Sequence, residues 1–549
     1  MTQMSFITLF FAHLKVYVEC VCLSCKEVCV IVCLEDKRML CHGPLHFIAF
    51  IQGFILVFSA YKKTLRAEKV AMGVAPHSLL ALTGQLPWLL LLALLTPWNF
   101  LRAEELKPTR WPMFSQKPLL LAWNAPTEDC RPRHGVRFPL EQFQIVASPN
   151  EGFVRQNLTI FYKDRLGLYP YYERDGTAVN GGLPQAASLM QHYEKMPEGV
   201  HKYISEPNAK GLAVIDWEEW RPLWIRNWDV KDVYRNQSRQ LVANKNLEWP
   251  MERVGKVAQQ EFELSARKFM LETLRLAKSL RPNQLWGFYL FPDCYNHDYR
   301  SGLENYTGRC PDVEVARNDQ LTWLWTESTA LFPSVYMSTV LRSTMFGRQF
   351  VRNRVKEGMR LASAGDGLAR PVFVYTRPTY ANELTPLTET DLVSTIGESV
   401  ALGASGVIIW GDHTYASSNA SCSSLSEYLR GPLGRYLFNV STAAELCSQK
   451  LCGFHGRCLR KHSDTDAYLH LSPLTHSISS QGGRLKVTGQ LGQGELAGYR
   501  QHFHCQCYSG YKGEGCAQRE LGKSGAAPVW KVWSVLTLLL PLGLLTVLH

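Results

Sequence analysis

Apolar runs alternate with amphipathic stretches from residue 104 to about residue 440. The segment Val254 to Leu280 carries the apolar spacing of a helix, whereas the apolar runs have the length of buried strands. Those runs are "PLLLAW", "FQIVAS", "GLAVID", "LWGFYLF", "PVFVYT" and "GVIIWG". Strands that alternate with helices form parallel βαβ units, and this many in one domain predict an α/β fold of the (β/α) barrel type. A doubly wound sheet is the alternative, but no Gly-rich phosphate loop follows a strand, which argues against a nucleotide-binding version.

The N-terminal hundred residues carry a targeting pattern. "LPWLLLLALLTPW", Leu86 to Trp98, has the length and composition of the apolar core of a signal peptide. Because Met72 stands just upstream, residues 72–103 are predicted to be a signal peptide. Residues 1–71 then come from an alternative translation start or from upstream sequence that was included by error. The competing interpretation is a genuine extension anchored in a membrane by Leu45 to Ala60.

The C-terminal residues 519–549 end in a second apolar segment, Val529 to His549, which is preceded by small residues. This order of small residues, spacer and apolar tail is typical of a GPI-attachment signal, with Ser524 or Gly525 as the attachment site. A transmembrane helix is the alternative. Either interpretation places the body of the protein outside the cell, at the cell surface, with an endosomal or lysosomal pool as an alternative location.

The cysteines fall into two groups. Six lie within the first 41 residues, and ten lie between Cys130 and Cys516. Five N-glycosylation sequons accompany the second group, at Asn157, Asn236, Asn305, Asn419 and Asn439. An even number of cysteines together with several sequons favours an oxidising, secretory compartment. Residues 441–518 are especially rich in cysteine and are predicted to form a second, smaller domain after a barrel domain at 104–440.

Composition adds a weak hint about partners. With 46% hydrophobic and 19% charged residues, the 549-residue chain is globular, not disordered. A formal charge of +11 suits a polyanionic partner, although ordinary solvation explains such a balance equally well. We expect no nucleic-acid partner, and no motif implies a metal or an organic cofactor.

Two acidic residues follow the run "GLAVID". On a strand, residues two apart project from the same face, so Asp216 and Glu218 point together while Trp217 points away. Two neighbouring carboxylates repel, so one tends to keep its proton near neutral pH, as a general acid must. In a barrel, this end of the strand forms the mouth of the active site. The simpler interpretation is a solvated strand terminus.

Other predicted strands also end in aromatic or hydroxyl groups. Tyr289, the pair Ser334 and Tyr336, and Trp410 each follow an apolar run. Aromatic planes pack against the C–H faces of sugar rings, and hydroxyls hydrogen-bond to sugar substituents. Together these residues favour a carbohydrate cleft, although any one of them alone is more often a core residue.

Five separated motifs make the chain resemble the vertebrate hyaluronidases over roughly residues 104 to 520. They are "GLAVIDWEEWRPLWIRNW", "LWGFYLFPDCYNHDY", "CPDVEVARNDQLTWLW", "ALFPSVYM" and "GASGVIIWGDH". The resemblance implies an endo-β-N-acetylhexosaminidase on a distorted (β/α) barrel, which cuts hyaluronan at β-1,4 bonds after N-acetylglucosamine. It implies a substrate-assisted retaining mechanism, one of the exceptions to the two-carboxylate scheme.

The resemblance also implies a role for each candidate. Glu218 is the expected proton donor, and Asp216 the group that orients and stabilises the substrate acetamide. Tyr289 and Tyr336 match tyrosines that contact the acetamido group and the sugar at the cleavage point. Ser334, Arg354 and Trp410 match cleft residues, and Arg354 is expected to face the glucuronate carboxylate, with helix-surface solvation as the alternative.

The last six cysteines resemble an EGF-like domain, except that residues 459–504 separate the third and fourth cysteines unusually far. Spacing alone leaves the connectivity open, and zinc binding fits poorly because no pair has the C-x2-C spacing. The pairs that the resemblance implies are Cys130–Cys422, Cys294–Cys310, Cys447–Cys458, Cys452–Cys505 and Cys507–Cys516.

Two alternatives remain open at this point. A hyaluronan-binding adhesion receptor keeps the same cleft but turns over slowly or not at all, since a fold does not guarantee a rate. Chondroitin, which differs from hyaluronan at a sugar hydroxyl, is an alternative substrate. Loss of polymer length distinguishes an enzyme from a receptor.

Overall fold

The computed structural model describes residues 106–482 and 484–520. The predicted extension, the predicted signal peptide and the predicted attachment sites lie outside these residues. Within them, no helix is long and apolar enough to cross a membrane. The described residues belong to one compact unit that begins at Glu104.

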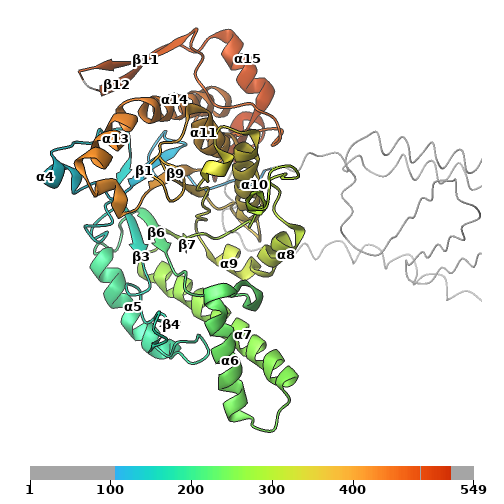
Figure 1. The fold of residues 1–549 in the computed structure, drawn as a ribbon. Helices are drawn as coiled ribbons and strands as arrows, with labels where there is room; N and C mark the ends of the chain where they lie inside the picture. The colour runs from blue at the N-terminus through green and yellow to red at the C-terminus, as the bar shows by residue number, and fades with distance from the viewer. Residues whose placement is uncertain (1–105, 483, 521–549) are drawn as a thin grey trace, which may run out of the picture. The chain divides into compact units, whose positions relative to one another are not determined.

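Seven parallel strands form the centre of this unit (Figure 1). One sheet has the order β2-β1-β9-β8 and the other has the order β3-β6-β7, with every pair parallel. The strands are β1 (Leu120–Asn124), β2 (Ile145–Val146), β3 (Leu158–Phe161), β6 (Gly211–Ile215), β7 (Gln284–Phe288), β8 (Phe373–Thr376) and β9 (Gly406–Trp410). Each of the six predicted apolar runs contains a strand. Only β3 was not predicted.

Residues 331–334 connect the two sheets. Parallel bridges pair Tyr289 with Phe332, Leu331 with Val372, and Ser334 with Tyr375, so this segment runs between β7 and β8. Within residues 106–482 and 484–520, no ladder of hydrogen bonds joins β2 to β3. The expected barrel is therefore a mixed α/β arrangement of parallel strands that is not closed by hydrogen bonds.

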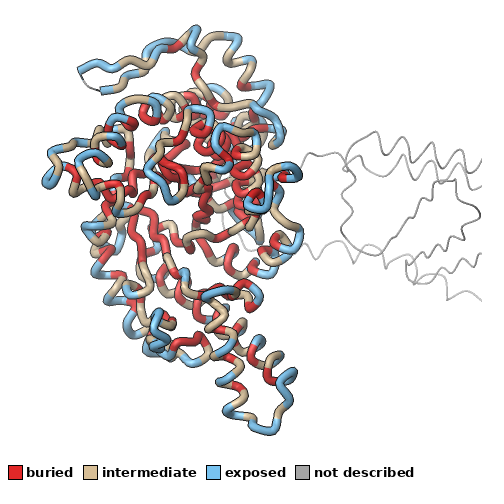
Figure 2. Tube along the Cα trace, in the orientation of Figure 1, coloured by how far each residue is buried: buried red, intermediate tan, exposed pale blue. Residues whose placement is uncertain are grey.

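Helices cover the strands, and their apolar faces supply the core. The long helix α7 (Met251–Leu280) turns a stripe of apolar side chains inward, at the three- and four-residue spacing that the sequence predicts. Figure 2 shows the buried positions along the strands and on the inner sides of the helices. The other main helices of this part are α5 (Leu189–Tyr203), α6 (Asp232–Lys245), α8 (Asp312–Gln320), α9 (Thr322–Glu327), α10 (Met345–Ala362) and α13 (Asn419–Arg430).

Short elements follow the helix α14 (Pro432–Cys452). Two antiparallel pairs, β10 with β13 and β11 with β12, flank the helix α15. Their bounds are β10 (Gly456–Arg460), β11 (His476–Gln481), β12 (Arg484–Gly489), α15 (Gln493–His502), β13 (Phe503–Cys507), β14 (Tyr511–Lys512) and β15 (Gln518–Arg519).

The predicted boundary at residues 440 and 441 falls inside α14, so it does not separate two folding units. Side chains from both sides of that boundary, such as Leu437 and Cys447, belong to the same buried cluster. The boundary was misplaced because the cysteines begin at Cys447, whereas the helix that carries them begins at Pro432. One buried cluster extends across the predicted boundary, so the structure does not establish an independent EGF-like domain.

A buried ion network also joins the two regions. Glu398, at 0% exposure, accepts a hydrogen bond from Arg352 Nε at 2.7 Å and is paired with the equally buried Arg460 of β10. Arg352 Nη2 continues the network to Asp466 at 2.8 Å. Because buried charges need partners, this network fixes β10 and the following loop to α10.

The structure contains the five disulfides that the resemblance implies, Cys130–Cys422, Cys294–Cys310, Cys447–Cys458, Cys452–Cys505 and Cys507–Cys516. Cys130–Cys422 spans 292 residues and ties the first helix, α4 (Cys130–His134), to α13. The chain is therefore crosslinked both over long distances and within its C-terminal part.

Candidate active site

Asp216 and Glu218 extend β6 beyond its last ladder residue. The N–H group of Asp216 donates to Phe161 O at 2.9 Å, which continues the strand pairing with β3. Val214, Asp216 and Glu218 line one small pocket. Trp217 points the opposite way and stacks on Tyr169, with ring centroids 4.4 Å apart. The alternation predicted from the sequence is present.

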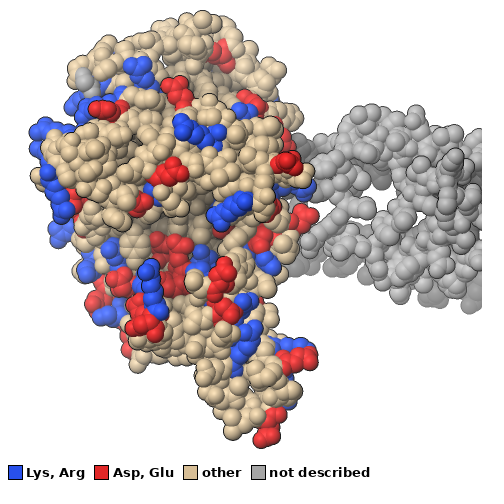
Figure 3. All heavy atoms as spheres, in the orientation of Figure 1, with Lys and Arg blue, Asp and Glu red and all other residues tan. Residues whose placement is uncertain are grey.

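The pocket lies at the carboxyl ends of the strands and combines acids with aromatic rings. In Figure 3, acidic side chains gather in a hollow near the middle of the molecule. Strands from both sheets contribute to the pocket, as the parallel topology requires. Its lining consists of Ile160, Val214, Asp216, Glu218, Tyr289, Tyr375 and Trp410.

Asp216 is the carboxyl group that keeps its proton. Its Oδ1 is out of contact with solvent and has no hydrogen-bond partner among the described residues. Burial, with a smaller contribution from the charge of Glu218, raises the pKa of Asp216 from 3.8 to about 8. The sequence argument gave the retained proton to Glu218. The structure gives it to Asp216, because desolvation outweighs the position along the strand.

Glu218 is held by Arg221 and opens to solvent. Its side chain is 49% exposed, and its Oε2 accepts from Arg221 Nη2 at 3.3 Å. Arg221 Nη1 also donates to the backbone O of Glu218 at 3.0 Å, and Lys231 Nζ donates to the same oxygen. Arg221 is buried, so it forms a fixed support for a solvent-accessible acid.

Aromatic residues surround the two acids. The N–H group of Tyr289 donates to Ile215 O at 2.9 Å, which places this residue beside Asp216. The Tyr289 ring meets the Tyr375 ring edge to face at 5.1 Å, and the Tyr336 ring stacks on the Trp410 ring at 5.6 Å. Burial raises the pKa of both Tyr289 and Tyr336 above the usual range, so both phenols stay protonated as hydrogen-bond donors.

Ser334 and Arg354 lie beneath this aromatic wall. Ser334 is buried and pairs with Tyr375 across the strand edge. Arg354 is only 4% exposed, and its Nε donates to Ser334 O at 2.7 Å. Its Nη2 contacts Asp293 Oδ1 at 2.8 Å, and its Nη1 contacts Asn296 Oδ1 at 3.2 Å.

The contact of Arg354 with a glucuronate carboxylate stays a prediction, although protein groups already occupy its guanidinium group. The guanidinium group is already surrounded by protein acceptors, and helix-surface solvation is excluded by its burial. The helix α10 turns Arg354 inward toward the loop after β7. Its observed contacts are those of a residue that fixes Ser334 and Asp293.

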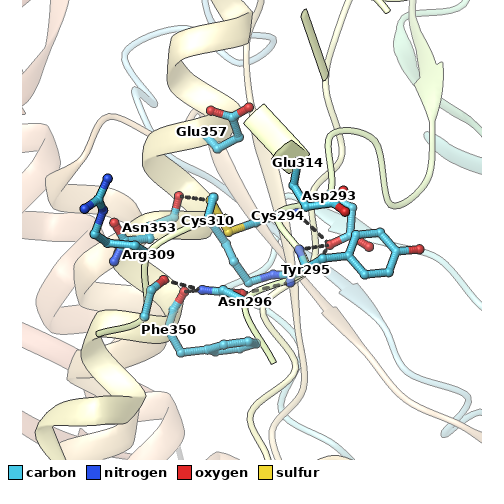
Figure 4. The surroundings of a disulfide bond; sticks show 12 residues. Asp293, Cys294, Tyr295, Asn296, Arg309, Cys310, Glu314, Phe350, Asn353 and Glu357 are labelled. Atoms are coloured by element: carbon cyan, nitrogen blue, oxygen red, sulfur yellow. Dashed lines mark hydrogen bonds and ion pairs between the residues drawn. A yellow bond between two sulfur atoms is a disulfide. The ribbon is translucent and has the colours of Figure 1, made fainter. Parts of the chain in front are cut away.

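The loop after β7 is stapled by Cys294–Cys310, as Figure 4 shows. Asn296 lies within the closed loop and is buried. Its Nδ2 donates to Gly308 O at 2.6 Å and to Phe350 O at 3.1 Å, so the amide ties both sides of the loop to α10. This loop starts one residue after Tyr289 and fixes the backbone behind it.

Four of the five sequons present exposed asparagines, at Asn157, Asn236, Asn305 and Asn419. Asn439 lies on α14, is partly buried, and accepts a hydrogen bond from Leu471 N at 2.9 Å through its Oδ1. A glycan is carried on Nδ2, so this bond does not occupy the modified atom.

Sequence reasoning missed two members of the site. Tyr375 lies in the run "PVFVYT", which was interpreted only as a strand, although its tyrosine ends the run as Tyr289 ends another. Arg221 follows Glu218 by three residues, and its position below the acid depends on a turn held by Asn227, whose Oδ1 accepts from Arg221 N at 2.8 Å. Among the described residues, no group of His, Cys, Asp and Glu side chains is arranged to hold a metal.

Comparison with known proteins finds similarity to hyaluronidases. A family model described as hyaluronidase matches residues 108–520. Hyaluronidase-2 of Mus musculus is 50% identical over 480 residues, which is 86% of this chain and 98% of that protein. Hyaluronidase-2 of Homo sapiens is 52% identical over 451 residues, which is 81% of this chain and 95% of that protein.

A solved structure supports the same grouping. Bee venom hyaluronidase in complex with a hyaluronic acid tetramer is 31% identical, with a TM-score of 0.52 over 58% of this chain and 98% of that chain. The resemblance found in the five sequence motifs is therefore confirmed, including its similarity to hyaluronidase-2. The chain belongs to the hyaluronidase family of glycoside hydrolases.

Proposed function

We propose that this protein is an endo-β-N-acetylhexosaminidase that hydrolyses hyaluronan at β-1,4 bonds after N-acetylglucosamine. We further propose a substrate-assisted, retaining mechanism. The observation that carries both proposals is the pairing in one pocket of the accessible Glu218 with Asp216, whose buried oxygen lacks a partner. The hyaluronan-bound relative supports the choice of polymer.

In this mechanism the two carboxyl groups hold one proton between them. In the free protein Asp216 keeps it, because that carboxyl group is desolvated whereas Glu218 is exposed and paired with Arg221. Bound sugar reverses this preference. It excludes water from Glu218, and its acetamido N–H supplies the hydrogen bond that Asp216 Oδ1 lacks. The proton then resides on Glu218, and Asp216 becomes the anion.

The first step breaks the glycosidic bond. Glu218 donates its proton to the leaving oxygen, while the acetamido carbonyl oxygen of the same sugar attacks C1 from the opposite side. The attacking group is already on the substrate, so it acts at a high effective concentration. The C1–oxygen pair of electrons leaves with the protonated sugar. Asp216 stabilises the positive oxazolinium ring that forms.

The second step restores the sugar. The Glu218 carboxylate takes a proton from water, whose oxygen attacks C1 and opens the oxazolinium ring. Two inversions at C1 give net retention, and Glu218 again carries the proton. Arg221 stabilises the carboxylate form between the two steps through its contact with Oε2.

Aromatic groups hold the sugar in this position. The phenol of Tyr289 lies beside Asp216 and donates to the acetamido group. The stacked pair Tyr336 and Trp410 offers a flat surface to the C–H face of the sugar ring. Tyr375 packs edge-on against Tyr289 and fixes its ring.

We also propose that the enzyme acts at the cell surface, tethered by a GPI anchor at Ser524 or Gly525. Five disulfides and four exposed sequons are consistent with an oxidising, extracytoplasmic environment. The order of pairing of the last six cysteines supports an EGF-like character for the C-terminal part, built onto α14.

The test compares the purified full-length protein with its Glu218→Gln variant on high-molecular-weight hyaluronan between pH 4 and 7. We expect the wild type to shorten the polymer on a gel and the variant to leave it intact. Binding without shortening by either protein supports the adhesion-receptor alternative. Equal shortening by both proteins contradicts the role of Glu218. Replacing hyaluronan by chondroitin in the same assay decides between the two polymers.

A further inference from the structure

Two adjoining surface grooves flank the segment 136–142, away from the catalytic pocket. The first groove is lined by Arg131 and Arg137 together with apolar side chains such as Phe138. The second is lined by Arg430 and Arg484 together with apolar side chains that include Phe438. Each groove therefore combines two guanidinium groups with a partly apolar floor.

The first groove begins close to the candidate active site. Asn124 of β1 pairs with Trp410 of β9, and its neighbour Trp123 pairs with Val146 of β2. Trp123 and Val146 line the first groove. Neighbouring strands lie about 4.8 Å apart, so the backbone of Val146 lies about 10 Å from that of Trp410, two strands along the sheet. The side chain of Trp123 faces the opposite side of the sheet from that of Trp410. The second groove continues outward toward the hairpin of β11 and β12.

The four arginines are available to a ligand. All four are exposed, and the side chains of Arg131, Arg137 and Arg484 make no hydrogen bond or ion pair with other described residues. Arg430 Nη2 donates to Arg137 O at 2.7 Å, which joins the two grooves. Figure 3 shows basic side chains along the edge of the molecule where Figure 1 places α4.

Acidic side chains line the grooves as well, but two of them have local partners. Glu128 Oε1 accepts from Asn150 N at 2.9 Å, and Glu151 Oε2 accepts from Gln156 Nε2 at 3.3 Å. Both lie in the first groove, whereas Glu141 lies in the second. The acids of the first groove are thus held by the protein backbone and by a neighbouring amide, whereas Arg131 and Arg137 have no such side-chain partner among the described residues.

We propose that Arg131, Arg137, Arg430 and Arg484 form a substrate exosite that binds carboxylates of the polysaccharide outside the catalytic pocket. This inference rests on the proposed function and extends it to the distant part of the polymer. Hyaluronan carries one carboxylate in every disaccharide, and a guanidinium group binds a carboxylate through two parallel hydrogen bonds. Sugar rings pack their C–H faces on the apolar floor between the arginines.

The position of the first groove at the carboxyl ends of β1 and β2 favours this occupant. A polymer that leaves the pocket at Trp410 and crosses the rim of the sheet reaches the first groove and then the second. The exosite therefore adds affinity only for chains long enough to occupy the catalytic pocket and the exosite at once. It raises the effective concentration of the polymer at the pocket and leaves the rate of bond cleavage unchanged.

The test uses two charge-reversal variants of the full-length protein, Arg131→Glu/Arg137→Glu and Arg430→Glu/Arg484→Glu. The matched control is Lys245→Glu/Lys268→Glu, which reverses two exposed charges on α6 and α7, at the other end of the molecule in Figure 1. We expect each exosite variant to raise KM for long hyaluronan about 5- to 20-fold with kcat changed less than twofold. The Arg430/Arg484 variant should leave KM for a hyaluronan hexasaccharide unchanged, because that chain ends before the second groove.

Further measurements separate the outcomes. Thermal unfolding of each variant checks that the fold is intact, and a Glu218→Gln background allows the affinity for uncut polymer to be measured directly. An unchanged KM for long polymer, or an equal rise for polymer and hexasaccharide, overturns the exosite. Loss of heparin binding with unchanged hyaluronan kinetics overturns it as well, because the surface then serves a sulfated chain. If the wild type cuts no polymer, the proposed function fails before the exosite is in question.

Discussion

Two carboxyl groups that stand two residues apart have different environments in this protein. Asp216 faces the inside of the strand arrangement, where burial raises its pKa to about 8. Glu218 lies two residues further along the extended chain, beyond the last hydrogen-bonded residues of β6. Its side chain there is 49% exposed and contacts Arg221. The different environments of the proposed orienting group and the proposed proton donor therefore arise from about two residues of extended chain.

The first prediction concerns stability and pH. A carboxyl group whose pKa is raised on folding costs no stability below pH 3.8 and destabilises the fold increasingly up to about pH 8. Asp216→Asn removes this cost. Because the pKa rises from 3.8 to about 8 and one pKa unit corresponds to about 1.4 kcal/mol, we expect the variant to be more stable than wild type by about 5 kcal/mol at pH 8 and by less than about 1 kcal/mol at pH 4. Urea unfolding at both pH values measures this. A variant that is less stable than wild type at pH 8 contradicts the proposed burial of the uncompensated carboxyl group.

The second prediction concerns activity at the same two positions. We expect Glu218→Gln to lower kcat by about 10²- to 10⁴-fold, which is the usual contribution of a general acid. Because Glu218 is exposed, its stability should change by less than about 0.5 kcal/mol. Initial rates and urea unfolding on the same preparation make the comparison. A large loss of stability together with activity indicates a structural role instead.

For single residues, the sequence predicted which way a side chain points better than it predicted how far that side chain is buried or which groups it contacts. Strand alternation alone placed Asp216 and Glu218 on one side and Trp217 on the other. The location of the retained proton depends on burial by β3 and β7, which no local pattern reports. The protein contacts of Arg354 were missed for the same reason, because its partners Asp293 and Asn296 lie about 60 residues away in the chain.

Among the elements, the segment after β6 supplies both acids of the site, and the loop after β7 supports Tyr289 from behind. Its disulfide closes residues 294 to 310, and Asn296 and Arg354 fix it to α10. The loop follows directly after Tyr289, so disorder in the loop would loosen the phenol that faces the pocket.

The third prediction follows from this loop. A disulfide that closes a loop of this length contributes about 3 kcal/mol by the chain-entropy model. We expect Cys294→Ser/Cys310→Ser to lose about that much stability and also to raise KM several-fold. The control is Cys507→Ser/Cys516→Ser, which removes a shorter loop far from the pocket in sequence and should leave KM unchanged. Thermal unfolding and steady-state kinetics check both variants, and an unchanged KM in the first would separate the loop from substrate binding.

The sequence predicted those strands whose apolar runs are uninterrupted, because the side chains of these strands are buried on both faces of the sheet. All six apolar runs contain strands because parallel strands are covered on both sides and lack polar interruptions. The strand β3 was missed because it has only four residues, and the first two of them, Leu158 and Thr159, belong to the sequon at Asn157. Closure of the barrel was expected but is not present as a hydrogen-bond ladder, since sequence reports strands and not the pairing of β2 with β3.

At the scale of the described residues as a whole, the C-terminal part is joined to α10 by charge as well as by apolar packing. Glu398 lies between Arg352 and Arg460 without contact with solvent. Removing one member of a buried network leaves the others uncompensated, which costs more than the network itself contributes.

The fourth prediction tests this connection. We expect Glu398→Gln to lower stability by about 3 to 5 kcal/mol, because two buried guanidinium groups then share a neutral partner. The control is Glu252→Gln, at an exposed pair with Lys256, which should cost less than about 0.5 kcal/mol. Thermal unfolding followed by both near-UV and far-UV circular dichroism is the measurement. Two separate transitions in the wild type would contradict a single cooperative unit.

The long disulfide Cys130–Cys422 also affects the order in which disulfides form during synthesis. Cys130 precedes its partner by 292 residues, so at about 5 to 20 residues per second its thiol waits roughly 15 to 60 s for Cys422. Cys294 and Cys310 appear in the meantime, only 16 residues apart, and their loop closes within seconds of translation. In an oxidising compartment, rapid closure of that local pair removes the two thiols with which Cys130 would otherwise form a wrong bond. The small loop beside the catalytic pocket therefore protects the order of assembly of the entire chain.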